Sequence, residues 1–181
     1  MAMWEAGAPM IAGRQSPDPS MVHVWALYAL GLQAVLWIWG AVVIAFLIVS
    51  SNAVVALSLL VVSVVLGAST SYAWASLYHR YYRWEFADEQ MHVWRGILFR
   101  RRLTIPYMRV QNATVVRGPL LMLFGLSSIV VDTAAAGPYP YGFSYGLSSL
   151  SGAYLPGVQE GERVADAIIE AAKRTRVREG L

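Results

Sequence analysis

The sequence predicts an α+β membrane protein, in which a two-helix transmembrane hairpin precedes an antiparallel β sandwich or partly closed barrel capped by a C-terminal helix. Three observations lead to this prediction. No Asp, Glu, Lys or Arg occurs between Pro19 and Tyr78. Short stretches with the two-residue period of strands follow Arg80. An amphipathic stretch with apolar residues every fourth position comes last, so β elements are followed by one helix.

The uncharged segment contains two apolar runs, Val24–Val49 and Val54–Leu77, each longer than the roughly 20 residues that a helix needs to cross a bilayer. Only Ser50–Asn52 separates them, which predicts two antiparallel helices joined by a tight turn. Met1–Met21 has neither an apolar period nor the basic segment of a signal peptide. We therefore expect a flexible tail over residues 1–21 and a transmembrane hairpin over residues 22–79.

Basic residues predict the orientation of this hairpin. The turn between the two helices carries no Lys or Arg, whereas arginines follow the second helix at positions 80, 83, 95 and 100–102. Basic flanks stay in the cytoplasm. We therefore expect a multi-pass protein of the cell membrane with both termini cytoplasmic. The mild net charge of +3 is typical of contact with anionic lipid rather than with nucleic acid.

Small residues recur every four positions on the second predicted helix, at Ser63, Gly67 and Ser71. This spacing lets two helices approach closely, so we expect the stripe to pack against the first helix. Contact with a second copy is the alternative, and together with Trp37 and Trp39 it suggests a second hypothesis, a subunit of a small oligomeric transporter or channel. The absence of intramembrane charge argues against a pump or ion channel.

The charged part of the chain, residues 80–178, predicts one small domain built mainly from strands. Proline at position 106 ends a short strand, and a Gly-, Pro- and Tyr-rich loop follows the last clear one. The expected strands are Arg83–Asp88, Met91–Leu98, Leu103–Ile105, Val110–Val116 and Ser127–Thr133, with one or two more in Leu147–Leu155 before a turn at Pro156-Gly157.

The end of the chain predicts a helix from Glu160 to about Arg176. Val164, Ile168 and Ala172 repeat every four residues and form one apolar face. Acidic residues come early and basic residues late, which suits the helix dipole. We expect this helix to cover an open face or end of the sheet, and a pleckstrin-homology-like fold is one of the architectures that fit.

Two motifs carry a family resemblance. They are Ile105-Pro106-Tyr107-Met108-Arg109-Val110-Gln111-Asn112, and Gly118-Pro119-Leu120 leading to Leu123-Phe124-Gly125-Leu126 and Val131-Asp132-Thr133-Ala134. With Tyr82-Arg83-Trp84 after a membrane hairpin, they resemble the bacterial pleckstrin-homology-like membrane-flanked domain family, the YdbS-like proteins. The resemblance covers roughly Val24 to Ala172. It implies a domain of seven strands and a C-terminal helix, without recognised catalytic residues. Leu121 and Met122 depart from a charged pair that is frequent in the family.

The candidate contact residues are arginines. Arg100, Arg101 and Arg102 mark a predicted hairpin tip, which is either a solvated turn that enforces the orientation or a contact with anionic headgroups. Arg109 and Arg117 lie one strand further on and are candidates to join them. The apolar segment Leu120–Phe124 is a second candidate to meet the bilayer surface or a partner.

The sequence offers little catalytic chemistry. His23, His79 and His92 have no metal-ligand spacing, and the absence of Cys excludes disulfides and thiolate sites. Ser127, Ser128 and Asp132 lack the surroundings of a hydrolase nucleophile. We expect no catalytic residues, cofactor, metal or nucleic acid. The predicted function is that of a non-enzymatic integral membrane protein whose cytoplasmic domain binds lipid headgroups, a membrane-protein partner or a second copy.

Overall fold

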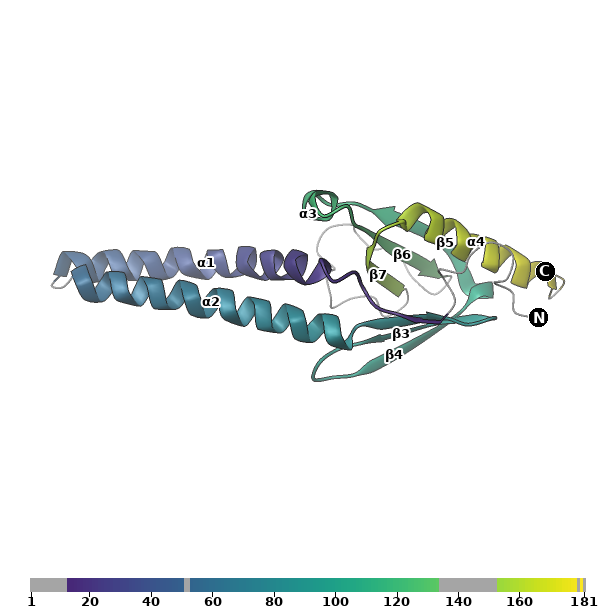
Figure 1. The fold of residues 1–181 in the computed structure, drawn as a ribbon, viewed down its shortest axis with the longest axis horizontal. Helices are drawn as coiled ribbons and strands as arrows, with labels where there is room; N and C mark the ends of the chain where they lie inside the picture. The colour runs from purple at the N-terminus through teal and green to yellow at the C-terminus, as the bar shows by residue number, and fades with distance from the viewer. Residues whose placement is uncertain (1–12, 51–52, 134–152, 179, 181) are drawn as a thin grey trace. The chain divides into compact units, whose positions relative to one another are not determined.

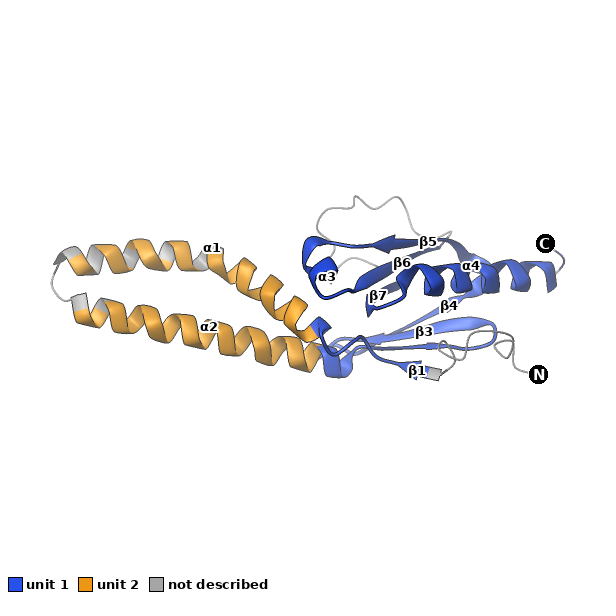
Figure 2. Cartoon of the chain, turned by 45° about the horizontal axis from the view of Figure 1, so that its top comes forward, with its two compact units in different colours: residues 1–21, 79–181 blue, residues 22–78 orange. Residues whose placement is uncertain are grey.

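The computed structural model describes residues 13–50, 53–133, 153–178 and 180, and it divides the chain into two compact units (Figure 2). Unit 1 contains Met1–Met21 and His79–Leu181, and unit 2 contains Val22–Tyr78. Unit 2 is therefore inserted into the sequence of unit 1, and two chain connections join them.

The two predicted helices of the hairpin form. Helix α1 spans Met21–Ser50 and α2 spans Ala53–Tyr81, and the two lie side by side (Figures 1 and 2). In the described residues one segment has the length and composition of a membrane span, Leu57–Tyr81 in α2, with a mean hydropathy of 1.6. Among the α1 residues whose side chains the structure describes, the same criterion finds the apolar stretch Met21–Ala34, so a second crossing stays a prediction.

Gly67 lies where α2 meets α1. A Cβ atom at this position would overlap Cζ2 of Trp37 and lie 3.0 Å from Oε1 of Gln33. Ser71, one turn further on, is buried, whereas Ser63 is exposed and donates its hydroxyl to the carbonyl of Leu60. Within the predicted stripe, Gly67 is thus the position at which a small residue permits close contact between the helices.

The part of unit 1 that the structure describes contains two antiparallel sheets and the helices α3 and α4 (Figure 1). In the described residues the first sheet has the order β1-β2-β3-β4, and the second has the order β5-β6-β7. A single 3-10 turn, Tyr107–Arg109, joins the sheets. The elements are β1 Gly13–Gln15, β2 Arg83–Phe86, β3 Gln90–Arg95, β4 Arg101–Pro106, β5 Val110–Val116, α3 Pro119–Leu123, β6 Ser127–Thr133, β7 Ala153–Val158 and α4 Gly161–Arg178.

Strand β1 corrects the prediction of a flexible tail over residues 1–21. Its three residues pair antiparallel with β2, and the Trp84 indole donates a hydrogen bond to Oε1 of Gln15 at 3.1 Å. Asp18 then donates its N–H to the carbonyl of Gly157 at 3.0 Å, and its carboxylate accepts from Gln159 at 2.7 Å. Residues 1–12 lie outside the described residues. A strand of three residues is too short to produce a readable alternation, which is why the sequence did not indicate it.

A second correction concerns the end of the second sheet. Pro156 and Gly157 belong to β7 instead of turning the chain. Gly157 has a φ of +67°, and a Cβ there would lie 3.1 Å from the Met21 side chain. The backbone of β7 therefore lies close to Met21, the first residue of α1. The predicted loop and the first part of the predicted strand, residues 134–152, lie outside the described residues.

The core lies between the sheets and α4. Alternate residues of β2 and β3 face inward, and α4 packs on β5, β6 and the 3-10 turn, as expected for a covering helix. Burying one Ile or Leu side chain contributes about 1.5–3 kcal/mol. The buried apolar side chains include Trp84, Phe86, Met91, Val93, Ile105, Ile129, Val131, Leu155, Ala165 and Ile168.

Candidate functional site

The first sheet turns one face away from the core, and this face is polar and basic. The strand register aligns two neighbouring rows of side chains across it. Opposite residues within a row have Cβ atoms about 4.5–5.5 Å apart, and diagonal neighbours in the two rows are about 7–8 Å apart, which long and aromatic side chains can still bridge. One row is Arg14, Glu85, His92 and Thr104, and the next is Arg83, Trp94 and Arg102.

Trp94 is the centre of this face. The guanidinium carbon of Arg14 lies 4.5 Å from the centroid of the indole ring, and that of Arg102 lies 5.3 Å from it. Arg102 also contacts His92, with Nη2 at 3.4 Å from Nε2. A cation–π contact at an exposed site is worth about 0.5–1 kcal/mol. We call Arg14, Trp94, Arg102 and His92 the guanidinium–indole cluster.

His92 is the titratable ring of the cluster. Its side chain is 8% exposed, and Nδ1 lies 3.0 Å from the Thr104 hydroxyl. Burial and then the charge of Arg102 lower the pKa of His92 below its usual 6.5, and Glu85 acts in the opposite direction. The ring is therefore neutral near pH 7, and the positive charge of the face comes from its arginines.

The arginines of this face have no carboxylate partner within ion-pair distance among the described residues. The ion pairs found there join Arg117 to Glu162, Arg163 to Glu160, Arg174 to Glu170 and Arg178 to Glu89. Glu85 stands opposite Arg14 in the register but does not form an ion pair with it. Among the described residues, the charges of Arg14, Arg83 and Arg102 are thus not neutralised by an ion pair.

The turn between β3 and β4, which we call the tip, exposes apolar side chains beside these charges. Gly96 opens the turn with a φ of +105°, a conformation that favours glycine. Leu98 and Phe99 are 80% and 81% exposed. The guanidinium carbon of Arg100 lies 5.1 Å from the ring of Tyr81, the last residue of α2. The tip therefore lies at the end of unit 1 where the chain arrives from the hairpin.

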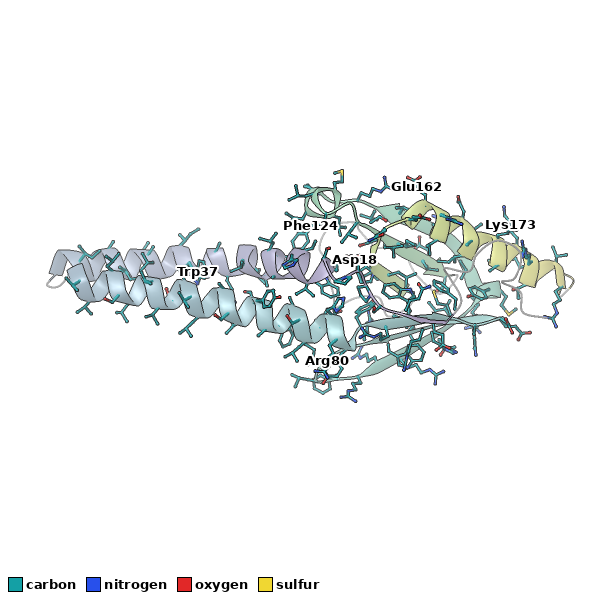
Figure 3. The ribbon with its side chains drawn as sticks, in the orientation of Figure 1. Asp18, Trp37, Arg80, Phe124, Glu162 and Lys173 are labelled. Carbon is teal, nitrogen blue, oxygen red and sulfur yellow. The ribbon has the colours of Figure 1, made fainter. Side chains whose placement is uncertain are left out.

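Helix α3 adds a second apolar projection. Pro119 occupies its first turn and Leu121 is buried, whereas Met122 and Leu123 are 59% and 75% exposed. Figure 1 shows α3 and the tip at the same end of unit 1, and Figure 3 shows Phe124 and Arg80 toward this end with Lys173 toward the other. Two exposed apolar turns thus share one end of the domain.

The predicted contact arginines are only partly brought together. Arg100–Arg102 lie at the tip and the start of β4. Arg109 lies in the 3-10 turn beyond the far end of β4, and the strand, at about 3.3 Å per residue, carries the chain about 17 Å from Arg101 to Pro106. Arg117 follows β5 and pairs with Glu162 at 3.3 Å. The sequence did not single out Arg14 or Trp94, whose proximity depends on β1 pairing with β2.

Ser127, Ser128 and Asp132 lie on β6 of the second sheet, whereas His92 lies on β3 of the first. The Ser127 hydroxyl donates to the carbonyl of Val158 at 2.7 Å, and the Ser128 hydroxyl accepts from Tyr154 at 2.9 Å. These interactions give both serines a structural role. In the part of the chain that the structure describes, no three His, Asp or Glu side chains gather as metal ligands would.

Comparison with known proteins agrees with this architecture. The family model described as "Bacterial PH domain" matches residues 21–172. A curated relative, the UPF0699 transmembrane protein YdbS of Bacillus subtilis (strain 168), is 26% identical over 97 residues, which is 54% of this chain and 53% of the relative. The chain thus spans about half the length of that relative. No solved structure matches. The sheets, the C-terminal helix and the family match together show that the chain belongs to the bacterial PH domain family.

Proposed function

We propose that this chain is a non-enzymatic membrane protein whose α1–α2 hairpin spans the bilayer and whose PH-like unit 1 binds lipid headgroups at the cytoplasmic surface. The surface of α2 is the observation that carries this proposal. Leu57–Tyr81 is apolar enough to cross a membrane, and 6% of its most apolar window is buried. Exposed apolar helix surface of this length is unfavourable in water and favourable in hydrocarbon.

The distribution of arginines supports the cytoplasmic placement of unit 1. Ser51 and Asn52, which connect the helices, carry no charge, whereas Arg80 and Arg83 follow α2 directly. Positive residues near a helix end favour the cytoplasmic side. The printed description of the Bacillus subtilis relative as a transmembrane protein supports the same proposal.

The end of unit 1 that carries Tyr81 supports contact with the membrane surface. The tip presents Leu98 and Phe99, and α3 presents Met122 and Leu123. Apolar side chains flanked by arginines suit the headgroup layer, where the rings and aliphatic groups enter the acyl boundary and the charges meet phosphates.

Single-cysteine labelling tests the proposed topology. The chain contains no Cys, so Ser51→Cys and Arg178→Cys each provide one reporter without background. In spheroplasts, whose cell membrane is still sealed, a membrane-impermeant maleimide should label Ser51→Cys. It should label Arg178→Cys, whose side chain is exposed, only after lysis.

The controls separate orientation from insertion. Both variants should stay in the membrane pellet after alkaline carbonate extraction, because a spanning hairpin resists it. Labelling of Arg178→Cys in sealed spheroplasts, or release of either variant by carbonate, would overturn the proposal.

A further inference from the structure

The tip and α3 explain an apolar contact with the membrane, but they leave the guanidinium–indole cluster without a role. We propose that Arg14 and Arg102, stacked on Trp94, bind the phosphate of an anionic lipid headgroup. This site deepens the proposed function and rests on it. Arg102 is the one residue of this cluster that the sequence had indicated as a contact residue.

The first step of the argument is charge. Arg14 and Arg102 both contact the Trp94 ring, at 4.5 Å and 5.3 Å, so their guanidinium carbons lie within the sum of these distances, about 10 Å. Neither forms an ion pair with a described carboxylate. Two positive charges therefore lie at one indole ring, and an anion bound there is attracted by both.

The second step is preorganisation. A guanidinium that stacks on a ring keeps its N–H groups at its edge, where they can donate to two oxygens of one phosphate. Arg102 is held by Trp94 and His92, and Arg14 is anchored by the pairing of β1 with β2. Side chains already fixed in position lose less conformational entropy when a ligand binds.

The third step is position. Arg83, Trp94 and Arg102 form one row across the sheet, and Arg83 follows Tyr81, the end of α2, by two residues. At about 3.3 Å per residue, these two residues span at most about 7 Å of chain. Each headgroup layer of a bilayer is about 5–8 Å thick. If α2 spans the membrane to Tyr81, the chain therefore keeps Arg83 within reach of the headgroup layer, and the row that begins at Arg83 continues across the sheet to Trp94 and Arg102.

The exposed apolar residues of the tip favour a lipid over a soluble phosphate compound. Leu98 and Phe99 lie in the turn that leads from Trp94 to Arg102. A phosphate attached to acyl chains can engage the arginines and the apolar turn together, whereas inorganic phosphate or a sugar phosphate engages only the arginines.

The test compares lipid retention by the full chain purified in detergent. The double variant Arg14→Gln/Arg102→Gln removes the proposed donors, and Arg163→Gln/Arg174→Gln on α4 is a control with the same change in net charge. Phosphatidylglycerol and phosphatidylcholine are added at equal concentration, and bound lipids are counted by native mass spectrometry. We expect the wild type and the control to retain phosphatidylglycerol preferentially. The double variant should retain at least five-fold less phosphatidylglycerol than the wild type.

Three further arms make the result decisive. Arg14→Gln alone, which leaves the contact of Arg102 with Trp94, should give a smaller loss and does not depend on the folding of the double variant. Trp94→Leu should also weaken retention, because it removes the stacking surface while leaving both charges. Millimolar inorganic phosphate or glycerol 1-phosphate should not displace the lipid, and displacement would assign the site to a soluble phosphate and overturn the lipid assignment.

Failure of this site is distinguishable from failure of the proposed function. Equal retention of phosphatidylglycerol by the wild type and a correctly folded double variant, both resistant to carbonate extraction, would overturn the site and leave the membrane anchor intact. Release of the wild type from membranes by carbonate would instead overturn the anchor.

Discussion

Gly67→Ala tests the packing of the hairpin most directly. The new methyl group would overlap Cζ2 of Trp37 and lie 3.0 Å from Oε1 of Gln33. Adding a methyl group to a well-packed site costs about 1–3 kcal/mol. Alanine also stabilises a helix by about 0.5–1 kcal/mol relative to glycine, so the two effects oppose each other and the variant needs a matched control.

Gly31→Ala is that control, since nothing lies within 4 Å of the position where its Cβ would be placed. The gain in helix propensity is common to both variants, and the overlap belongs to Gly67 alone. We therefore expect Gly67→Ala to be less stable than Gly31→Ala by about 1–3 kcal/mol. At about 2–4 °C per kcal/mol for a chain of this size, the Tm values should differ by about 2–12 °C.

The assay is thermal unfolding of the full chain in detergent, followed by intrinsic Trp fluorescence. A double-mutant cycle with Trp37→Ala identifies the partner, because the cost of Gly67→Ala should largely disappear once the indole is gone. Equal Tm values for Gly67→Ala and Gly31→Ala would refute the close contact between α1 and α2.

Two further predictions concern unit 1. Ile168→Ala should destabilise the domain by about 2–5 kcal/mol, because this side chain of α4 is fully buried on the face of the helix that packs on the second sheet. In the same thermal assay Val177→Ala, at an α4 side chain that is 78% exposed, should have an effect within about 0.5 kcal/mol, and similar losses in both would contradict the placement of α4. His92 has a pKa below 6.5 in the folded chain because of burial and Arg102, so the unfolded chain takes up the proton more readily and stability should fall as the pH drops below 6.5. His92→Gln should lose part of this dependence when Tm is measured between about pH 7.5 and 5, and identical pH profiles would show that the ring does not contribute.

The strands that the sequence predicted are those with a readable alternation. Val110–Val116 forms β5 with the predicted bounds, and Ser127–Thr133 forms β6. The C-terminal helix was predicted from Glu160 and begins at Gly161. It could be predicted because its apolar face repeats over several turns. These elements contain enough residues for their periods to stand out from chance.

The guanidinium–indole cluster could not be predicted in the same way. Arg14 and Trp94 are 80 positions apart in the sequence, and they meet only because β1 pairs with β2 and β2 with β3. In the sequence, Arg14 belongs to a Gly- and Pro-containing segment without a period. Arg109, in contrast, is close to Arg102 in the sequence, but β4 carries the chain away from the tip before it. Proximity along the chain is a poor guide where an extended strand intervenes.

The insertion of α1 and α2 between β1 and β2 has a consequence for biosynthesis. A ribosome makes β1 first, but its partner emerges only after Val22–Tyr78 has been synthesised. Completion of the four-stranded sheet therefore waits for the apolar segment to leave the translation machinery and reach its final environment. If the hairpin spans the bilayer as proposed, a nascent chain whose α2 ended on the wrong side would hold β1 and β2 in separate compartments, with two unpaired strand edges that proteases and chaperones can recognise.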